Sequence, residues 1–157
     1  MRVTKYNTQL NEEKCCVLVK ESSVNYCSDF SKFTEPYQIF RLMCDVFKHN
    51  KQTEEYLYLL CFATNGRLIG VFEISHGCAN ASLCNPREIF MKAMLCNATS
   101  IVLVHNHPSG ESTPSKTDMS TAAKISEAAK LMGINFLDNM VIGNDYYSFR
   151  EMNLLEL

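Results

Sequence analysis

The stretch SIVLVHNHPSGESTPSKTD, residues 100–118, contains the features that decide the fold. Within its first seven residues, 101–104 form a continuous apolar run, which predicts a strand that is buried on both faces and central in its sheet. Residues 108–114 are rich in proline, glycine and serine and predict a loop. Ser115 is then expected to cap a helix over 116–132, which Gly133 ends. A buried strand that leads into a helix is typical of an α/β fold.

Hydrophobic patterning predicts further elements on both sides of this stretch. On the N-terminal side, we expect a short strand at 15–20, a polar loop at 22–34, a helix from Pro36 to near His49–Asn50, and a hairpin of strands 54–63 and 67–75 around Thr64-Asn65-Gly66. A helix should begin at 85–88, and strands should occupy 134–143 and 145–149. The order βα-ββ-α-β-α-ββ predicts an α/β protein with a single-domain mixed β-sheet flanked by helices.

Length, composition and charge narrow the possible classes of protein. The chain has 157 residues, of which 46% are hydrophobic, and this suits one globular domain. The formal net charge is -2, so the basic excess usual in nucleic-acid binders is lacking, and the nearest basic stretch, 48–51, is short. The N-terminus shows no apolar signal-peptide core, and no apolar run is long enough to span a membrane. We therefore expect a cytoplasmic location and no membrane association.

The eight cysteines, at positions 15, 16, 27, 44, 61, 78, 84 and 96, show no C-x-x-C spacing. A zinc ribbon or a thioredoxin-like motif is therefore unsupported. Without export, we expect the cysteines to stay reduced and to pack as small hydrophobic residues. Cys78, Cys84 and Cys96 precede the 100–118 stretch and could compete for a metal there, although none occupies a metal-motif position.

His105, His107 and Asp118 form a candidate metal site. Residues two apart on a strand point to the same face, so both imidazoles can share one cation. Asp118, in the first turn of the next helix, can supply an oxygen ligand. Two histidines and one carboxylate form an open catalytic zinc set, in which the pKa of a bound water falls to about 7. The alternative is that Ser115 and Asp118 only form a helix-capping box, with the H-x-H pair arising by chance.

The pattern H-x-H-x7-S-x2-D over residues 105–118 resembles the JAMM signature of the JAB/MPN metalloproteases. The fuller string HNHPSG-x3-PS-x2-D is similar to the bacterial RadC branch, and so are residues 54–70, 85–110 and 131–151. The resemblance covers about 36–151 and implies the JAB/MPN (cytidine-deaminase-like) architecture. It divides the chain into an N-terminal extension with a short strand at 1–35 and a RadC-like domain at 36–157. The helix-hairpin-helix region of longer RadC proteins has no counterpart here.

The resemblance also implies roles for individual residues. His105, His107 and Asp118 would bind Zn2+, and Ser115 would donate its hydroxyl to an oxyanion. The general base of the family is a glutamate at the start of the first sheet strand, a position that Glu55 fits best. Glu54 should face the other way, and Glu88 is a second candidate. Asn106 points away from the ligands, which favours a structural role, and Pro108, Ser109 and Gly110 shape the loop. Asn139 stands where the family usually has histidine.

Two classes of function follow from these expectations. The first is a zinc-dependent metallohydrolase that cleaves peptide or isopeptide bonds, with a peptide or protein as substrate. The second is a DNA-repair or mobile-element accessory protein of the RadC type, which would bind or cleave DNA, although the charge does not support a nucleic-acid partner. A metal-binding scaffold without turnover ranks third. The natural substrate and the oligomeric state stay open.

Overall fold

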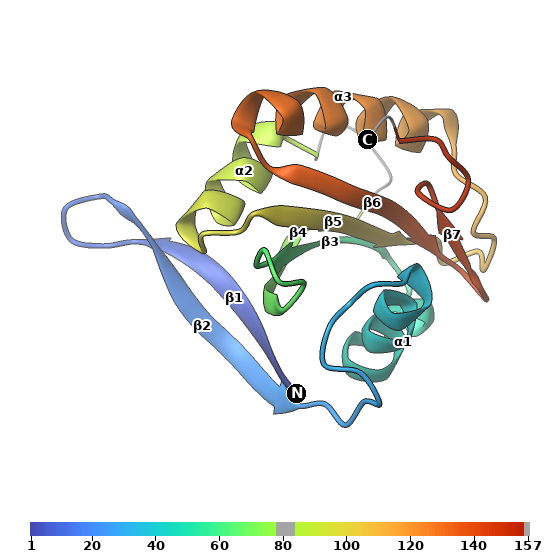
Figure 1. Ribbon diagram of the computed structural model, residues 1–157, viewed down its shortest axis with the longest axis horizontal. Coiled ribbons are helices and arrows are strands. Elements are labelled where there is room, and N and C mark those ends of the chain that lie inside the picture. Colours follow the sequence, from blue (N-terminus) through green and yellow to red (C-terminus); the bar gives the residue numbers. More distant parts are fainter. Residues whose placement is uncertain (78–83, 156–157) are drawn as a thin grey trace.

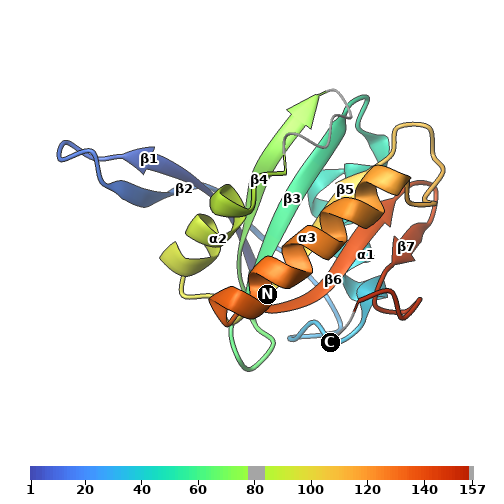
Figure 2. The same cartoon turned by 90° about the horizontal axis from the view of Figure 1, so that it is seen from above.

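The computed structural model describes residues 1–77 and 84–155, and Cys78 lies outside the described residues. Seven strands form one sheet in the order β2-β1-β4-β3-β5-β6-β7. Helices α2 and α3 cover one face of the sheet and α1 covers the other (Figures 1 and 2). The bounds are β1 Arg2–Leu10, β2 Cys16–Asn25, α1 Pro36–Phe47, β3 Glu55–Phe62, β4 Leu68–Gly77, α2 Pro86–Leu95, β5 Ser100–Asn106, α3 Lys116–Met132, β6 Asn135–Ile142 and β7 Tyr146–Ser148.

Strand β5 lies inside the sheet, between β3 and β6. It runs antiparallel to β3 and parallel to β6, which makes the sheet mixed. Alternate residues of β5 enter different cores: Leu103 packs with α2 and α3, whereas Val102 and Val104 pack with α1. Burial on both faces explains why this strand is a continuous apolar run. The predicted fold class, an α/β protein with a mixed sheet flanked by helices, is confirmed.

The N-terminal segment forms a long hairpin rather than the single short strand predicted at 15–20. Strands β1 and β2 pair antiparallel over almost their whole length, so the loop predicted from residue 22 was wrong up to Asn25. Beyond that pairing, β1 contacts β4 in register only at Lys5 and Tyr6, and the distal half of the hairpin projects from the body (Figure 1). Backbone hydrogen bonds hold these two strands together. Val3 is the one fully buried residue of β1, so the sequence lacks the alternation of apolar and polar residues that predicts a half-buried strand.

The three helices begin where the sequence predicts. Pro36 is the first residue of α1, behind a capping box formed by Glu35 and Gln38. Asn85 caps α2 through its side chain, which accepts a hydrogen bond from the Arg87 N–H. The C-terminus of α1 comes slightly earlier than expected, at Phe47, and a short 3-10 turn over His49–Lys51 follows it. These helix starts fix the orientation of the helices on the sheet.

The cysteines among residues 1–77 and 84–155 form no disulfide bonds. Cys61 and Cys84 are buried, whereas Cys15 and Cys27 are exposed, so packing in the core does not account for every one of them. Within residues 1–77 and 84–155, no helix combines the length and the apolar character needed to cross a membrane.

Asp138, in β6, is a buried carboxylate that fastens the C-terminal turn to the sheet. Its two oxygens accept hydrogen bonds from the Ser148 hydroxyl at 2.5 Å and from the Arg150 N–H at 2.9 Å. Burial raises the pKa of Asp138 to about 6, although these hydrogen bonds act in the opposite direction. The folded state holds the Asp138 proton more tightly than the unfolded state does. Protonated Asp138 therefore stabilises the fold at low pH, and this stabilisation is lost as the pH rises through about 6.

We expect Asp138→Asn to remove this pH dependence. Between pH 4 and 7, the free energy of unfolding of the wild type should fall relative to that of the variant, by at most about 3 kcal/mol. Asparagine keeps one acceptor oxygen for the Arg150 N–H and can donate through Nδ2 to the Ser148 hydroxyl oxygen, and it does not titrate in this range. Urea unfolding at several pH values measures this difference. Asp145→Asn, at an exposed position on the neighbouring turn, is the control, and a parallel pH profile for wild type and Asp138→Asn would contradict the prediction.

Candidate metal centre

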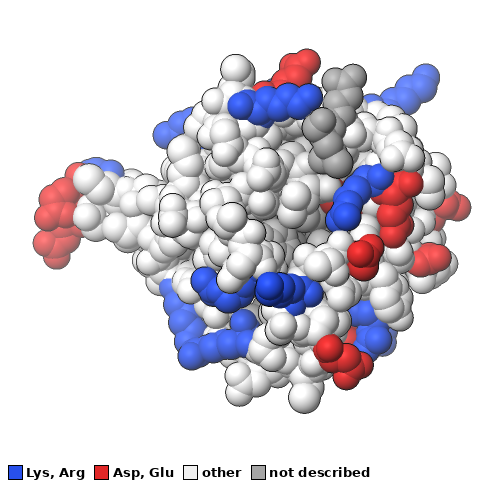
Figure 3. All heavy atoms as spheres, viewed as in Figure 1, with Lys and Arg blue, Asp and Glu red and all other residues white. Residues whose placement is uncertain are grey.

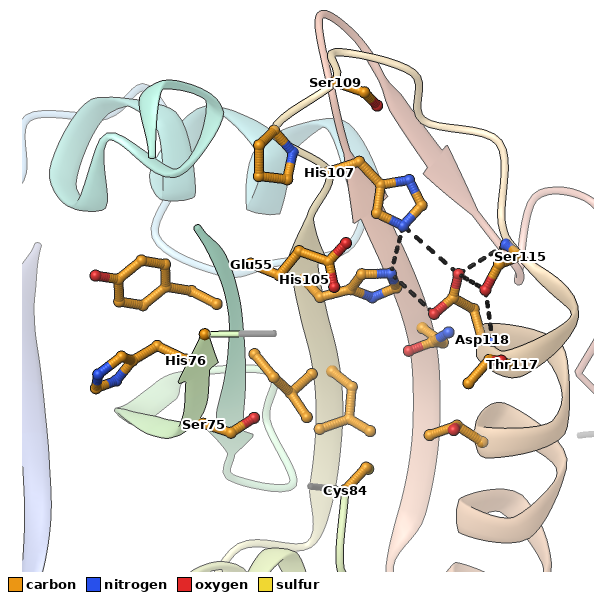
Figure 4. Close-up of a pocket in the computed structure, with 17 residues that line it drawn as sticks. Glu55, Ser75, His76, Cys84, His105, His107, Ser109, Ser115, Thr117 and Asp118 are labelled. Atoms are coloured by element: carbon orange, nitrogen blue, oxygen red, sulfur yellow. Dashed lines mark hydrogen bonds and ion pairs between the residues drawn. The ribbon is translucent and has the colours of Figure 1, made fainter. Parts of the chain in front are cut away.

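Two imidazoles converge at the C-terminal end of β5. His105 belongs to the strand and His107 follows directly after it, so the two side chains leave the sheet on the same face, as predicted (Figure 4). Their Nε2 atoms are 3.2 Å apart. Both side chains are mostly buried, with exposed fractions of 12% and 16%.

Asp118 brings a carboxylate to the same point from the first turn of α3. Its Oδ1 lies 3.2 Å from Nε2 of His105, and its Oδ2 lies 3.5 Å from Nε2 of His107. Ser115 caps this helix: its N–H and its hydroxyl both donate to Oδ2 of Asp118 at 2.7 Å, and its Oγ accepts from the Asp118 N–H. The capping box and the metal cluster therefore coexist, because the carboxylate that completes the cap also faces the imidazoles.

The electrostatics of the cluster favour the ionised Asp118 carboxylate that a metal requires, but they also favour the protonated form of His107, so a metal would compete with a proton there. Burial alone would raise the pKa of Asp118, but hydrogen bonds from His105 and His107 outweigh it and hold the pKa far below its ordinary value. The hydrogen bond to Asp118 likewise raises the pKa of His107. Nδ1 of His107 lies 2.8 Å from the Glu111 carbonyl. A proton on Nδ1 that is donated to this carbonyl leaves the Nε2 lone pair directed at the cluster.

The donor set fits a zinc ion. One ligand atom from each of the three residues can be chosen so that all lie within 4.8 Å of one another. Two ligand atoms that are each about 2.0–2.1 Å from a tetrahedral zinc ion lie about 3.3 Å apart, and the 3.2 Å separation of the two Nε2 atoms is close to this value. Three protein ligands leave a fourth position open to a reacting molecule, as in catalytic zinc sites.

A cavity of about 460 Å³ opens beside the cluster and contains Glu55. The cavity is lined by Glu55, Tyr56, Leu57, Ser75, His76, Gly77, Cys84, Leu103, His105, His107, Pro108, Ser109, Ser115, Thr117, Asp118, Thr121 and Asn139. Figure 4 shows the Glu55 carboxylate beside the two imidazoles, on the side away from Asp118. Glu55 is the first residue of β3, and the register Leu57↔His105 places it at the level of His107.

The other two glutamates that the sequence offered lie elsewhere. Glu54 is exposed and is not among the residues that line the cavity. Glu88 lies in the first turn of α2, where its carboxylate is 3.1 Å from Arg87 and 3.7 Å from Lys92. The geometry therefore brings Glu55, and not Glu88, to the histidine and aspartate cluster.

Cys84 and Asn139 also line this cavity. Burial raises the pKa of the Cys84 thiol to about 11, so at neutral pH it is a neutral thiol and a poor metal ligand. Cys84 is not part of the cluster of potential ligands. Asn139 is almost fully buried in β6. The position at which the sequence departs from the RadC pattern is therefore part of the cavity.

The loop that supports His107 depends on a close approach of two glycines, which the sequence analysis missed. Gly110 has a positive φ, and its carbonyl accepts a hydrogen bond from the Asn144 N–H at 2.8 Å. A Cβ on Gly143 would lie 2.3 Å from the Gly110 carbonyl oxygen and 3.0 Å from the Glu111 carbonyl carbon. Only glycine at 143 lets the loop approach, and that approach holds the carbonyl that contacts His107.

The surface charge on one face of the molecule is mixed. On the face shown in Figure 3, lysine and arginine side chains lie in separate groups with acidic side chains among them. The tip of the β1–β2 hairpin carries the exposed pair Glu12 and Glu13. In the part of the chain that the structure describes, this face presents no continuous basic stripe of the kind that follows a nucleic-acid backbone.

We expect Gly143→Ala to weaken metal binding from a distance. The added methyl group meets backbone atoms, which cannot rotate away, so the 107–115 loop must move and carry the Glu111 carbonyl off Nδ1 of His107. Loss of such an outer contact lowers metal affinity about 10–100-fold. Zinc competition with a chelator measures the change. Gly133→Ala is the control, because it adds the same methyl group at a glycine with φ +65, where a Cβ would meet nothing within 4 Å. Equal zinc affinity in the Gly143 variant and wild type would refute the proposed link.

Comparisons with known proteins agree with this geometry. The RadC-like JAB domain family matches residues 33–154. A UPF0758 protein of Clostridium perfringens is 37% identical over 141 residues, covering 89% of this chain and 61% of the relative. One from Clostridium tetani is 40% identical over 78% of this chain and 53% of the relative. One from Pelobacter propionicus is 36% identical over 81% of this chain and 55% of the relative. The chain thus spans little more than half the length of these relatives, and it belongs to the RadC-like JAB domain family.

Proposed function

We propose that this chain is a zinc-dependent hydrolase that cleaves peptide or isopeptide bonds. The observation that carries the proposal is the convergence of His105, His107 and Asp118 on one point, with the Glu55 carboxylate in the same cavity. This combination supplies a ligand set with an open position and a base within one site. The family relationship raises the expectation of hydrolysis, while the matched relatives are named only as UPF0758 proteins.

Each residue in the cavity takes a defined part in this proposal. A zinc ion held by the three ligands would lower the pKa of a coordinated water to about 7 and polarise a substrate carbonyl. Glu55 accepts the proton of the attacking water and returns it to the amine that leaves. Asp118 stays ionised throughout, because its pKa is strongly lowered by the histidines.

Ser115 has a second part in the proposal. Its hydroxyl lines the cavity, where it can donate a hydrogen bond to the negative oxygen that develops on the substrate carbonyl. In the structure this hydroxyl donates to Oδ2 of Asp118 at 2.7 Å. The catalytic role therefore requires the hydroxyl to rotate from the carboxylate towards the substrate. The N–H of Ser115 also donates to Asp118, so the helix cap survives this rotation.

The first prediction from this proposal concerns the metal. Purified protein should retain about one zinc per chain, as expected of a single three-ligand site, after dialysis against metal-free buffer, and His107→Ala should lose it. His76→Ala is the matched control, since His76 lines the same cavity but stacks on Tyr56 and lies 2.8 Å from Glu73. Elemental analysis gives the stoichiometry. Zinc retained in His107→Ala, or lost equally in His76→Ala, would contradict the assigned ligand set.

The second prediction concerns the base. Glu55→Gln should lower kcat about 10²–10⁴-fold, because the amide cannot accept a proton. Zinc content should not change, since Glu55 is not one of the three ligands. Glu54→Gln makes the same chemical change one residue away, outside the cavity, and should leave kcat unaltered. Mixtures of fluorescence-quenched peptides and of lysine-branched isopeptides serve as substrates. No cleavage of either mixture by the zinc-loaded wild type would refute the proposed activity.

A further inference from the structure

Asn106 lies between the two histidines and belongs to the other face of β5. It is 1% exposed, and its carboxamide is directed at the backbone of β3 rather than into the cavity. Its Oδ1 accepts a hydrogen bond from the Tyr56 N–H at 2.7 Å. Its Nδ2 donates to the Glu54 carbonyl at 3.0 Å. The two peptide groups that it binds flank a single residue, Glu55.

These two bonds continue the sheet beyond the point where the regular ladder ends. The register of β3 with β5 runs from Phe62↔Ser100 to Leu57↔His105. One step further on, the side chain of Asn106 accepts from one peptide group and donates to another, as a peptide group of a neighbouring strand would. The carboxamide thus replaces backbone pairing at the place where β3 begins. Without it, the first residues of β3 would be paired on one side only, with β4 through Glu55↔Gly77 and Tyr56↔His76.

We propose that Asn106 is a positioning residue, which fixes the start of β3 so that the Glu55 carboxylate is held beside His105 and His107. The inference rests on the proposed role of Glu55 as the base. Glu55 follows two bend residues and the 3-10 turn of His49–Lys51, so the chain that precedes it offers no regular pairing. A base that is displaced by about 1 Å can lower the rate about 10²-fold, and this gives the clamp a functional consequence.

The chemistry of the clamp requires asparagine. Aspartate would keep the acceptor for the Tyr56 N–H but would set a carboxylate against the Glu54 carbonyl. Alanine would remove both bonds and leave the Tyr56 N–H and the Glu54 carbonyl without this partner. Serine carries one hydroxyl on a shorter side chain and cannot bridge both peptide groups. Asparagine therefore both accepts and donates at the spacing that this position presents.

Amide hydrogen exchange by NMR on the full chain tests the clamp without any substrate. In Asn106→Ala, the Tyr56 amide should exchange at least about 10-fold faster than in the wild type, while the amides from Leu59 onward stay protected. In Asn106→Asp, which keeps the acceptor, the Tyr56 amide should stay slow. Ser148→Ala is the control, because it removes another buried side-chain hydrogen bond, the one from Ser148 to Asp138, at a position distant in the sequence. Unchanged exchange at Tyr56 in Asn106→Ala would overturn the inference. If the alanine variant does not fold, fast exchange at Tyr56 in Asn106→Asp would overturn it.

A measurement of zinc affinity distinguishes two roles of Asn106: positioning Glu55, or holding the histidines at the end of β5. The metal ligands lie on the other face of β5 and on α3. Loss of a contact to a ligand typically lowers metal affinity about 10-fold, and the zinc affinity of both Asn106 variants should fall by much less than this. A larger loss of zinc affinity, with the Tyr56 amide still protected from exchange, would mean that Asn106 positions the histidines and not Glu55. Ser148→Ala should show wild-type zinc affinity.

A double-mutant cycle then tests the link to Glu55. With the peptide mixtures, Asn106→Ala and Asn106→Asp should lower kcat about 10–100-fold with little change in KM. In a Glu55→Gln background, the same changes should cause no further loss, because the group that they position is already inactive. Additive losses would overturn the inference. If Glu55→Gln is as active as the wild type, the proposed base is wrong, whereas the exchange result still decides whether the clamp exists.

Discussion

The antiparallel pairing of β3 with β5 is the constraint on which the candidate site depends. The pairing sets Leu57 opposite His105, and from this register the first residue of β3 reaches the histidines at the end of β5. A shift of one residue would turn Glu55 to the α1 face and bring Glu54 into its place. The register is fixed by burial on both faces, because Leu59 and Leu60 enter different cores. The hydrophobic core therefore determines which glutamate can serve the cavity.

The start of α3 shows how a local folding device also serves the centre. Ser115 and Asp118 satisfy free N–H groups of the first helical turn, which stabilises the helix in any protein. The same carboxylate faces His105 and His107, so the geometry of the third ligand follows from that of the cap. The loop before the helix is held in turn by the contact of Gly110 with Gly143 and Asn144. Secondary structure alone thus positions much of the site.

Much of this could be predicted from the sequence, because the signals are local. The apolar run of β5, the capping box of α3 and the alternation of His105 and His107 each depend on residues close together in the chain. The β1–β2 hairpin could not be predicted, since backbone pairing rather than burial stabilises it. The Asn106 clamp and the contact of Gly143 with Gly110 join residues 33–52 positions apart. Such contacts follow from the folded arrangement, and neither residue carries a local signal for them.

The cavity itself explains why Glu55 carries so much of the proposed chemistry. Among the residues that line it, Asp118 is committed to the cluster and to the helix cap, and the Cys84 thiol is kept neutral by burial. His76 is stacked on Tyr56 and lies 2.8 Å from Glu73. Asn139, at the position where the RadC pattern has histidine, carries a carboxamide that cannot serve as an acid or a base at neutral pH. In the proposed reaction, proton transfer next to the ligands thus falls to Glu55, whose two flanking peptide groups both bind the Asn106 carboxamide.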